Sequence, residues 1–228
     1  MIRQKRLASP KVSYSYGAYN VVKGKSQAIR ITEGCPNQCP YCYEPAEIKV
    51  FGVPEIVKNH VLIYDMNLLC KPKAMEILKE LAGKRVNNKP VNYELICGVD
   101  FRYLTKEIAI QLKKTRIKKI RLAWDWTFND QYKIKTAIFM LFKAGYKPTD
   151  IMVFMICNWN ISYKENLRKM ELCKVWGVQI SDCYFDNQTF PHVIPAYWTN
   201  EQNKNFRKKT RKHNQLVNFK LDPEILSG

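Results

Sequence analysis

The 228-residue sequence lacks several features that define common protein classes. It contains only 9 glycines, and it has no run of 18 apolar residues that would span a membrane as a helix. The segment Met1–Pro10 is basic and has no apolar stretch, so no secretory signal is predicted. Hydrophobic residues make up 46% of the chain, which excludes wholesale disorder. We therefore predict a cytoplasmic protein with one folded core and no membrane association.

Acidic residues are also scarce. The sequence has 20 Asp and Glu but 38 Lys and Arg, which gives a net charge of +18. The basic residues gather in three segments, Met1–Thr32, Lys106–Arg121 and Arg207–Lys212. Two interpretations remain open. The segments are either solvated faces, or surfaces that contact the phosphates of a nucleic acid. Charge alone does not name the partner.

Cysteine is unevenly distributed, and its spacing predicts a single metal centre. Three of the 8 cysteines lie close together, and no second C-x-x-C pair occurs. In a reducing compartment, clustered cysteines are metal ligands or catalytic groups more often than disulfides. An isolated cysteine is usually a small buried hydrophobe, although some here could face a cavity as hydrogen-atom donors or ligands of a second cluster. The isolated cysteines are Cys70, Cys97, Cys157, Cys173 and Cys183.

Short apolar stretches alternate with helical patterns along the chain, as in proteins built from βα units. This alternation predicts an α/β fold with a parallel sheet and right-handed crossovers. We predict a partial (βα)6 TIM-like barrel with a C-terminal extension, and an open doubly wound sheet remains the alternative. The expected segments are 1–25 (basic), 26–186 (core domain) and 187–228 (basic extension). The expected strands are Ala28–Ile31, Val61–Tyr64, Tyr93–Cys97, Ile117–Ala123, Ile151–Cys157 and Val178–Tyr184.

Helix boundaries are marked by capping residues. Thr105 is expected to cap the N-terminus of one helix, and a capping box begins at Ser162. Gly83, Gly145 and Gly177 each follow a helical stripe, where a left-handed C-cap is favoured. These signals predict helices in the intervals between the strands.

The three clustered cysteines, Cys35, Cys39 and Cys42, follow the first expected strand with C-x3-C-x2-C spacing. Active sites of parallel α/β proteins lie at the C-terminal ends of the strands. Three thiolates on one loop can hold three irons of a [4Fe–4S] cluster and leave the fourth iron open to a small ligand. A zinc site is the alternative, but it needs a fourth ligand that the three histidines do not supply at a suitable spacing.

This motif resembles that of the radical S-adenosylmethionine (radical SAM) superfamily, in which an aromatic residue usually precedes the third cysteine, as Tyr41 does here. The resemblance implies that the three cysteines ligate a [4Fe–4S] cluster and that S-adenosylmethionine (SAM) chelates the open iron. Tyr41 would pack near the adenine. Reductive cleavage of SAM would then yield a 5′-deoxyadenosyl radical that abstracts hydrogen from a substrate.

The same resemblance implies further SAM contacts at strand ends. Asp65 and Asn67 follow the second strand, where many family members carry a glycine-rich motif that this chain lacks. They could meet the SAM amino group, or they could simply cap the turn into the next helix. Asp125 is a candidate for the ribose hydroxyls, and Asn158 is a candidate for SAM or the substrate.

The segments Gly98–Arg102 and Arg121–Asp125 resemble those of a loosely characterised group of small radical SAM proteins. Within the first segment, an internal ion pair between Asp100 and Arg102 is expected as an alternative to a binding role. In the extension, a helix is expected near Asn200–Asn214, and Trp198 could stack on a base; the alternative is a packing helix with a solvated face.

We therefore predict a radical SAM enzyme supplied with electrons by a partner such as flavodoxin or ferredoxin, with no catalytic general base identifiable. The leading substrate class, chosen from the charge, is a nucleic acid or nucleotide derivative. The alternatives are activation of a glycyl-radical enzyme, modification of a peptide, or a non-enzymatic metal-containing module that binds nucleic acid. The sequence does not predict the oligomeric state.

Overall fold

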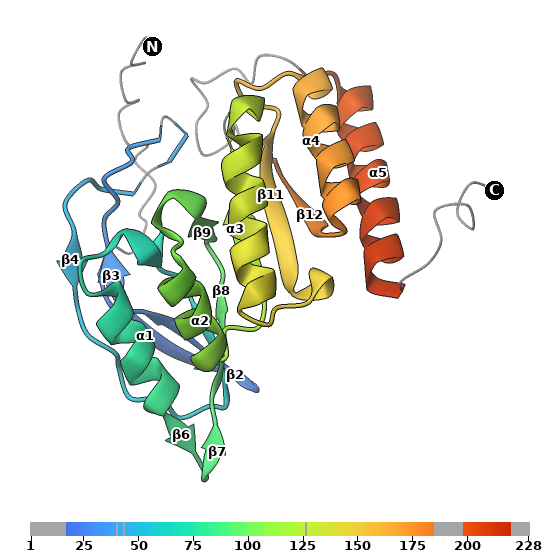
Figure 1. The fold of residues 1–228 in the computed structure, drawn as a ribbon. Coiled ribbons are helices and arrows are strands. Elements are labelled where there is room, and N and C mark those ends of the chain that lie inside the picture. Colours follow the sequence, from blue (N-terminus) through green and yellow to red (C-terminus); the bar gives the residue numbers. More distant parts are fainter. Residues whose placement is uncertain (1–16, 40, 43, 126, 185–197, 220–228) are drawn as a thin grey trace. The chain divides into compact units, whose positions relative to one another are not determined.

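The computed structural model describes residues 17–39, 41–42, 44–125, 127–184 and 198–219 and shows a mixed α/β protein (Figure 1). The chain divides into two compact units, Met1–Lys118 and Lys119–Gly228. Each unit contains a sheet with three parallel strands, and these six strands match the six expected from the sequence. The α/β fold class is therefore confirmed.

The sheet of the first unit has the order β1-β2-β5-β8. Strand β1 is antiparallel to β2, whereas β2, β5 and β8 are parallel, with Ala28 opposite Leu62 and Leu62 opposite Glu94. Alternate residues such as Ile29 and Ile63 are fully buried, as expected for strands that pack on a core. The bounds are β1 (Tyr19–Lys23), β2 (Ser26–Arg30), β5 (His60–Ile63) and β8 (Asn92–Leu95).

Two α-helices of the first unit contact each other (Figure 1). Thr105 caps α2 as expected, because its hydroxyl oxygen accepts a hydrogen bond from Ile108 N at 3.2 Å. The expectation for Gly83 is wrong, since Gly83 is the last residue of α1 and Lys84 is the C-cap, with extended backbone. The remaining elements are β3 (Thr32–Glu33), β4 (Lys49–Val50), η1 (Leu68–Cys70), α1 (Ala74–Gly83), β6 (Arg85–Val86), β7 (Lys89–Pro90), β9 (Val99–Asp100), η2 (Phe101–Tyr103) and α2 (Lys106–Lys114).

The second unit contains three parallel strands, β10, β11 and β12, with Ala123 opposite Phe154 and Phe154 opposite Ser181. Ile151 and Val153 of the central strand are fully buried. The elements are β10 (Ile120–Ala123), η3 (Phe128–Asp130), α3 (Gln131–Lys143), η4 (Pro148–Asp150), β11 (Ile151–Cys157), α4 (Tyr163–Trp176), β12 (Gln179–Tyr184) and α5 (Asn200–Phe219).

The caps of α4 largely follow the sequence. Ser162 Oγ accepts a hydrogen bond from Glu165 N at 3.1 Å, and Gly177 ends the helix in the left-handed region. Glu165 does not complete the capping box, because its carboxylate accepts a hydrogen bond from Phe128 N at 2.7 Å. Gly145, with φ of 93°, follows the α3 C-cap, Ala144.

Helix α5 packs beside α4 and against β12, with Phe206 fully buried (Figure 1). Buried His213 donates from Nε2 to Val178 O at 2.7 Å, and burial lowers the pKa of this imidazole. Trp198 is buried and donates to Ile161 O at 2.8 Å. The expectation that Trp198 stacks on a base is therefore wrong, because its ring belongs to the core. Among the described residues, no helix is both long and apolar enough to span a membrane.

Candidate functional site

The cysteine loop belongs to the first unit and connects the two strands of a small hairpin. Strands β3 and β4 pair antiparallel, with Thr32 opposite Val50 and Glu33 opposite Lys49. Inside this hairpin, Cys35 N donates to Pro45 O at 2.7 Å. The loop therefore starts just after the C-terminal end of β2, which is where the sequence predicts a site.

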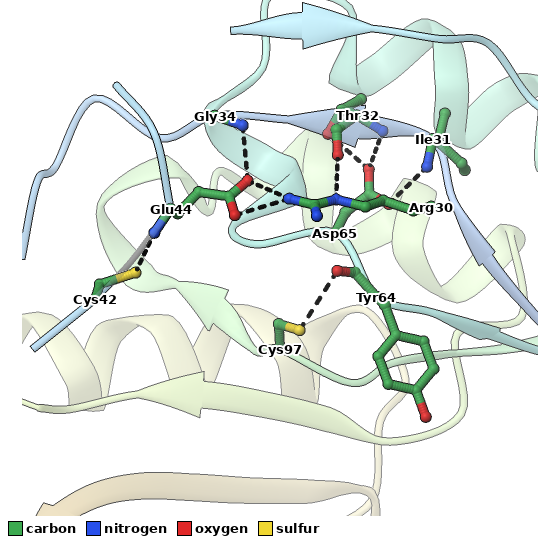
Figure 2. Close-up of polar contacts among 9 residues, drawn as sticks. All are labelled: Arg30, Ile31, Thr32, Gly34, Cys42, Glu44, Tyr64, Asp65 and Cys97. Atoms are coloured by element: carbon green, nitrogen blue, oxygen red, sulfur yellow. Dashed lines mark hydrogen bonds and ion pairs between the residues drawn. The ribbon is translucent and has the colours of Figure 1, made fainter. Parts of the chain in front are cut away.

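A buried ion pair closes the base of the loop. Both carboxylate oxygens of Glu44 accept hydrogen bonds at 2.7 Å from Arg30 Nη2 of β2, and Gly34 N donates to Glu44 Oε1 at 2.7 Å (Figure 2). The Arg30 and Glu44 side chains are 9% and 1% exposed, so this pair is shielded from water and salt. Sequence reasoning missed this contact, because nothing in the spacing of Arg30 and Glu44 indicates that they pair.

Gly34 is required by the close approach of the loop's return path. Its φ is +90°, and a Cβ placed on it would lie 1.8 Å from Glu47 O. Only glycine avoids both the strained conformation and the clash. The clash with Glu47 is visible only in the structure.

The three cysteines are reduced thiols that occupy different environments. Cys35 is buried, whereas Cys39 and Cys42 are partly exposed, and Cys42 N donates to Cys39 O at 3.0 Å. Cys42 Sγ also accepts a hydrogen bond from Glu44 N at 3.5 Å (Figure 2). Tyr41 lies in the same turn and is half-buried. Within the described ranges, no three Cys, His, Asp or Glu side chains converge closely enough to hold a metal ion.

Asp65 holds the end of β2 in place. Its carboxylate accepts hydrogen bonds from Ile31 N at 2.8 Å, from Thr32 N at 2.7 Å and from Thr32 Oγ1 at 2.6 Å (Figure 2). Burial raises the pKa of Asp65, although these donors oppose the shift. The sequence placed Asp65 correctly at a strand end, and the structure adds that its oxygens bind the backbone from which the cysteine loop starts.

Asp100 connects three segments around the loop. Its carboxylate pairs with Arg102 at 2.6 Å and accepts hydrogen bonds from Asn37 Nδ2 at 2.7 Å and Asn67 Nδ2 at 3.3 Å. The expected Asp100–Arg102 ion pair is thus confirmed. Burial acts to raise the pKa of Asp100, but the hydrogen bonds from Arg102 outweigh it and lower the pKa. Because Asn37 lies in the cysteine loop, Asp100 ties that loop to the segment after β8.

Asn67 lies beside Cys35 with an unused acceptor. It has a left-handed backbone with φ of 50°, and its Nδ2 also lies 3.6 Å from Cys35 Sγ. Its Oδ1 is buried and has no hydrogen-bond partner among the described residues. An unpartnered buried acceptor of this kind is rare in proteins and points to a missing donor.

Cys70 and Lys71 also belong to this site, although no motif singled them out. The Cys70 thiol hydrogen-bonds with Cys35, which lowers the pKa of Cys35 to about 6 and raises that of Cys70. Lys71 is 3% exposed. In the sequence, only their position indicates that they belong to the site, since both residues follow β5 at the strand edge where Asp65 and Asn67 lie.

The other predicted SAM contacts, Asp125 and Asn158, belong to the second unit. Asp125 follows β10 and Asn158 follows β11, so parallel pairing places both at the C-terminal edge of the same sheet. Asn158 has a φ of 60°, and its Oδ1 is buried without a hydrogen-bond partner among the described residues. Nearby Lys169 is buried and donates to Trp124 O at 3.1 Å, and desolvation lowers the pKa of its ammonium to about 8.

Comparison with known proteins finds similarity in structure only. No family model and no curated protein sequence matches the chain. Among solved structures, the radical SAM methyltransferase TsrM from Kitasatospora setae, with cobalamin and a [4Fe–4S] cluster bound, aligns with a TM-score of 0.53 and 11% identity. Coproporphyrinogen III oxidase (HemN) from Escherichia coli, described as a radical SAM enzyme, aligns with a TM-score of 0.51 and 11% identity. The chain has the fold of radical SAM enzymes.

The shared radical SAM fold extends over most of this chain but less than half of the solved structures. The alignments cover 69% of the chain and 36% of TsrM in one case, and 70% of the chain and 41% of HemN in the other. A second TsrM structure, with tryptophan and the SAM analogue aza-SAM bound, aligns with a TM-score of 0.54 over 36% of its length.

Proposed function

We propose that this protein is a radical SAM enzyme that binds a [4Fe–4S] cluster through Cys35, Cys39 and Cys42. The observation that carries the proposal is the position of a C-x3-C-x2-C loop directly after β2, in a chain with the radical SAM fold. When bound, the cluster would supply the electron that cleaves SAM into methionine and a 5′-deoxyadenosyl radical. We also propose that the chain adopts the partial (βα)6 TIM-like barrel fold that the sequence predicts.

The residues of the first unit fit such a group. The donor set is three thiols on one loop, which suits iron–sulfur chemistry. The loop is attached to β2 at its base by the Arg30–Glu44 pair, while Cys39 and Cys42 are partly exposed. Buried Asn67 Oδ1, beside Cys35, also accepts no hydrogen bond from a described residue. The protein's own contribution would be to hold the thiols, to orient SAM and to exclude water.

We propose two residues of the first unit for binding and supporting SAM. Asn67 Oδ1 would accept a hydrogen bond from the methionyl amino group, while Asp65 would support the site by holding Ile31 and Thr32. The roles expected for Tyr41, Asp125 and Asn158 in SAM binding remain predictions.

For the substrate, we propose a nucleic acid or a nucleotide derivative. The support is the exposed surface of α5 that carries Lys208, Arg211 and Lys212, whereas Arg207 pairs with Asp182 at 3.5 Å and lies over the ring of Tyr184. Such a row of cations can follow a phosphate backbone. A flavodoxin or ferredoxin would deliver the electron.

Anaerobic reconstitution tests the proposal directly. The wild-type protein should take up about four irons per chain, and reduction in the presence of SAM should release 5′-deoxyadenosine. The variant Cys39→Ala should lose the iron and the activity, whereas Cys183→Ala, which changes another half-buried cysteine, should keep both. Binding of zinc alone, without SAM cleavage, would refute the enzyme assignment.

The substrate class needs its own measurement. Binding to RNA or DNA should weaken steeply with salt, and replacing Lys208 and Arg211 with Gln should reduce the salt slope by about one unit per lost phosphate contact. Absent binding, or binding that does not depend on salt, would instead favour a peptide, a metabolite or a partner protein.

A further inference from the structure

Lys71 is a buried cation that makes no ion pair with a described carboxylate. The residue is 3% exposed, and its Nζ has no hydrogen-bond partner among the described residues. Burying an ammonium group without a partner costs several kcal/mol. An anion bound near the ammonium group of Lys71 would offset this cost.

The groups around Lys71 show where that anion would be. The positive charge of Lys71 acts to lower the pKa of Cys35, Cys70 and Asp65, although burial raises the pKa of Asp65 overall, so all three lie within electrostatic reach. Asp65 already accepts hydrogen bonds from the backbone of Ile31 and from Thr32. Cys70 lies close to Lys71 and interacts with its side chain, but it is a thiol and supplies no carboxylate. Cys35 is the remaining acid of the three, so we expect the anion on the side of Lys71 that faces Cys35.

A second cation near the loop, Arg102, differs from Lys71. Arg102 interacts electrostatically with Cys39, but it is paired with Asp100 at 2.6 Å and its side chain is 48% exposed. Its charge is therefore neutralised by its neighbour and screened by water. Lys71 is neither paired with a described carboxylate nor exposed to water. Its positive charge therefore acts on any group that the cysteine loop binds.

We propose that Lys71 is the counter-charge of the iron–sulfur cluster and raises the cluster's reduction potential. This inference rests on the proposed function. Three thiolates leave a [4Fe–4S] cluster with net negative charge, and the incoming electron adds to it. A buried ammonium nearby stabilises the more negative, reduced form, because charge and solvent exposure set the potential of such clusters.

Redox titration of reconstituted protein, followed by electron paramagnetic resonance in the absence of SAM, tests this directly. At a fixed potential, Lys71→Met should lower the ratio of reduced to oxidised cluster at least tenfold, which corresponds to about 59 mV for a one-electron couple. Lys71→Arg, which keeps the charge, should stay near the wild type. Lys73→Met is the matched control, since Lys73 is exposed and lies two residues away.

Unfolding of the cluster-free protein in urea is the second measurement, and it does not depend on iron. If Lys71 is unneutralised, Lys71→Met removes a costly buried charge, so the apoprotein should be at least as stable as the wild type. A clear loss of apoprotein stability would mean that Lys71 serves the fold, and would overturn the inference.

The outcomes separate this inference from the proposed function. A wild-type protein that takes up no iron refutes both. Cluster-loaded Lys71→Met with an unchanged potential refutes only the role of Lys71. If Lys71→Met cannot hold the cluster, retention of the cluster by Lys71→Arg supports the charge, and its loss from both variants refutes it.

Discussion

Replacing Gly34 with alanine should damage the cysteine loop in a way that the structure allows us to quantify. The new Cβ would lie 1.8 Å from Glu47 O, 2.5 Å from Glu47 C and 2.8 Å from Ile48 Cα. Real contacts do not fall below 3.0 Å, so the returning backbone must retreat by about 1.2 Å. All three obstructing atoms are backbone atoms, so no side-chain rotation relieves the clash.

Two costs add in this variant. A non-glycine residue at φ of +90° is strained by about 1–3 kcal/mol. Overpacking against the backbone adds a further 1–3 kcal/mol or so. Gly52 separates these terms, because its φ is +92° and a Cβ there would meet nothing within 4 Å. Gly52→Ala should therefore show the strain without the clash.

The assay is urea unfolding of both variants beside the wild type, with iron uptake measured in parallel. Gly34→Ala should be less stable than Gly52→Ala by about 1–3 kcal/mol and should take up less iron, since the loop is displaced next to Cys35. If the two variants unfold within about 0.5 kcal/mol of each other, the close approach of Gly34 to Glu47 does not constrain the loop, and the reasoning fails.

Two further predictions concern Asp100 and α5. The folded-state pKa of Asp100 lies below its ordinary 3.8, so its contribution to stability is present above that pH and is lost as pH falls through the folded value. In urea titrations from pH 7 to 2.5, the stability advantage of the wild type over Asp100→Asn should shrink below about pH 4; a constant advantage would contradict this. Phe206→Ala should cost about 3–5 kcal/mol because Phe206 is fully buried, whereas Phe219→Ala, at a side chain 69% exposed, should be nearly neutral. Equal losses in the two variants would show that α5 does not dock through Phe206.

Much of the fold could be predicted from local patterns. All six parallel strands and the cap at Ser162 lie where apolar runs and capping residues indicated. Such signals work because they act between residues close in sequence, where spacing determines which side chains meet. The prediction failed at Gly83, which α1 includes as its last helical residue, because a glycine after a helical stripe favours a left-handed C-cap without requiring one.

The candidate site was only partly predictable. The spacing of Cys35, Cys39 and Cys42 by itself indicated a cluster loop, since ligands on one loop must be local. The charges around that loop were not predictable, because Arg30 meets Glu44 and Lys71 approaches Cys35 only after β2 and β5 pair.

The sequence by itself determined the strands and the three candidate ligands, because both depend on short spacings. Only the tertiary structure decided which charges are paired and which are left without a partner. The electrostatic effect of a group depends on its burial and on neighbours distant in the chain, and the burial of Lys71 cannot be seen in the sequence.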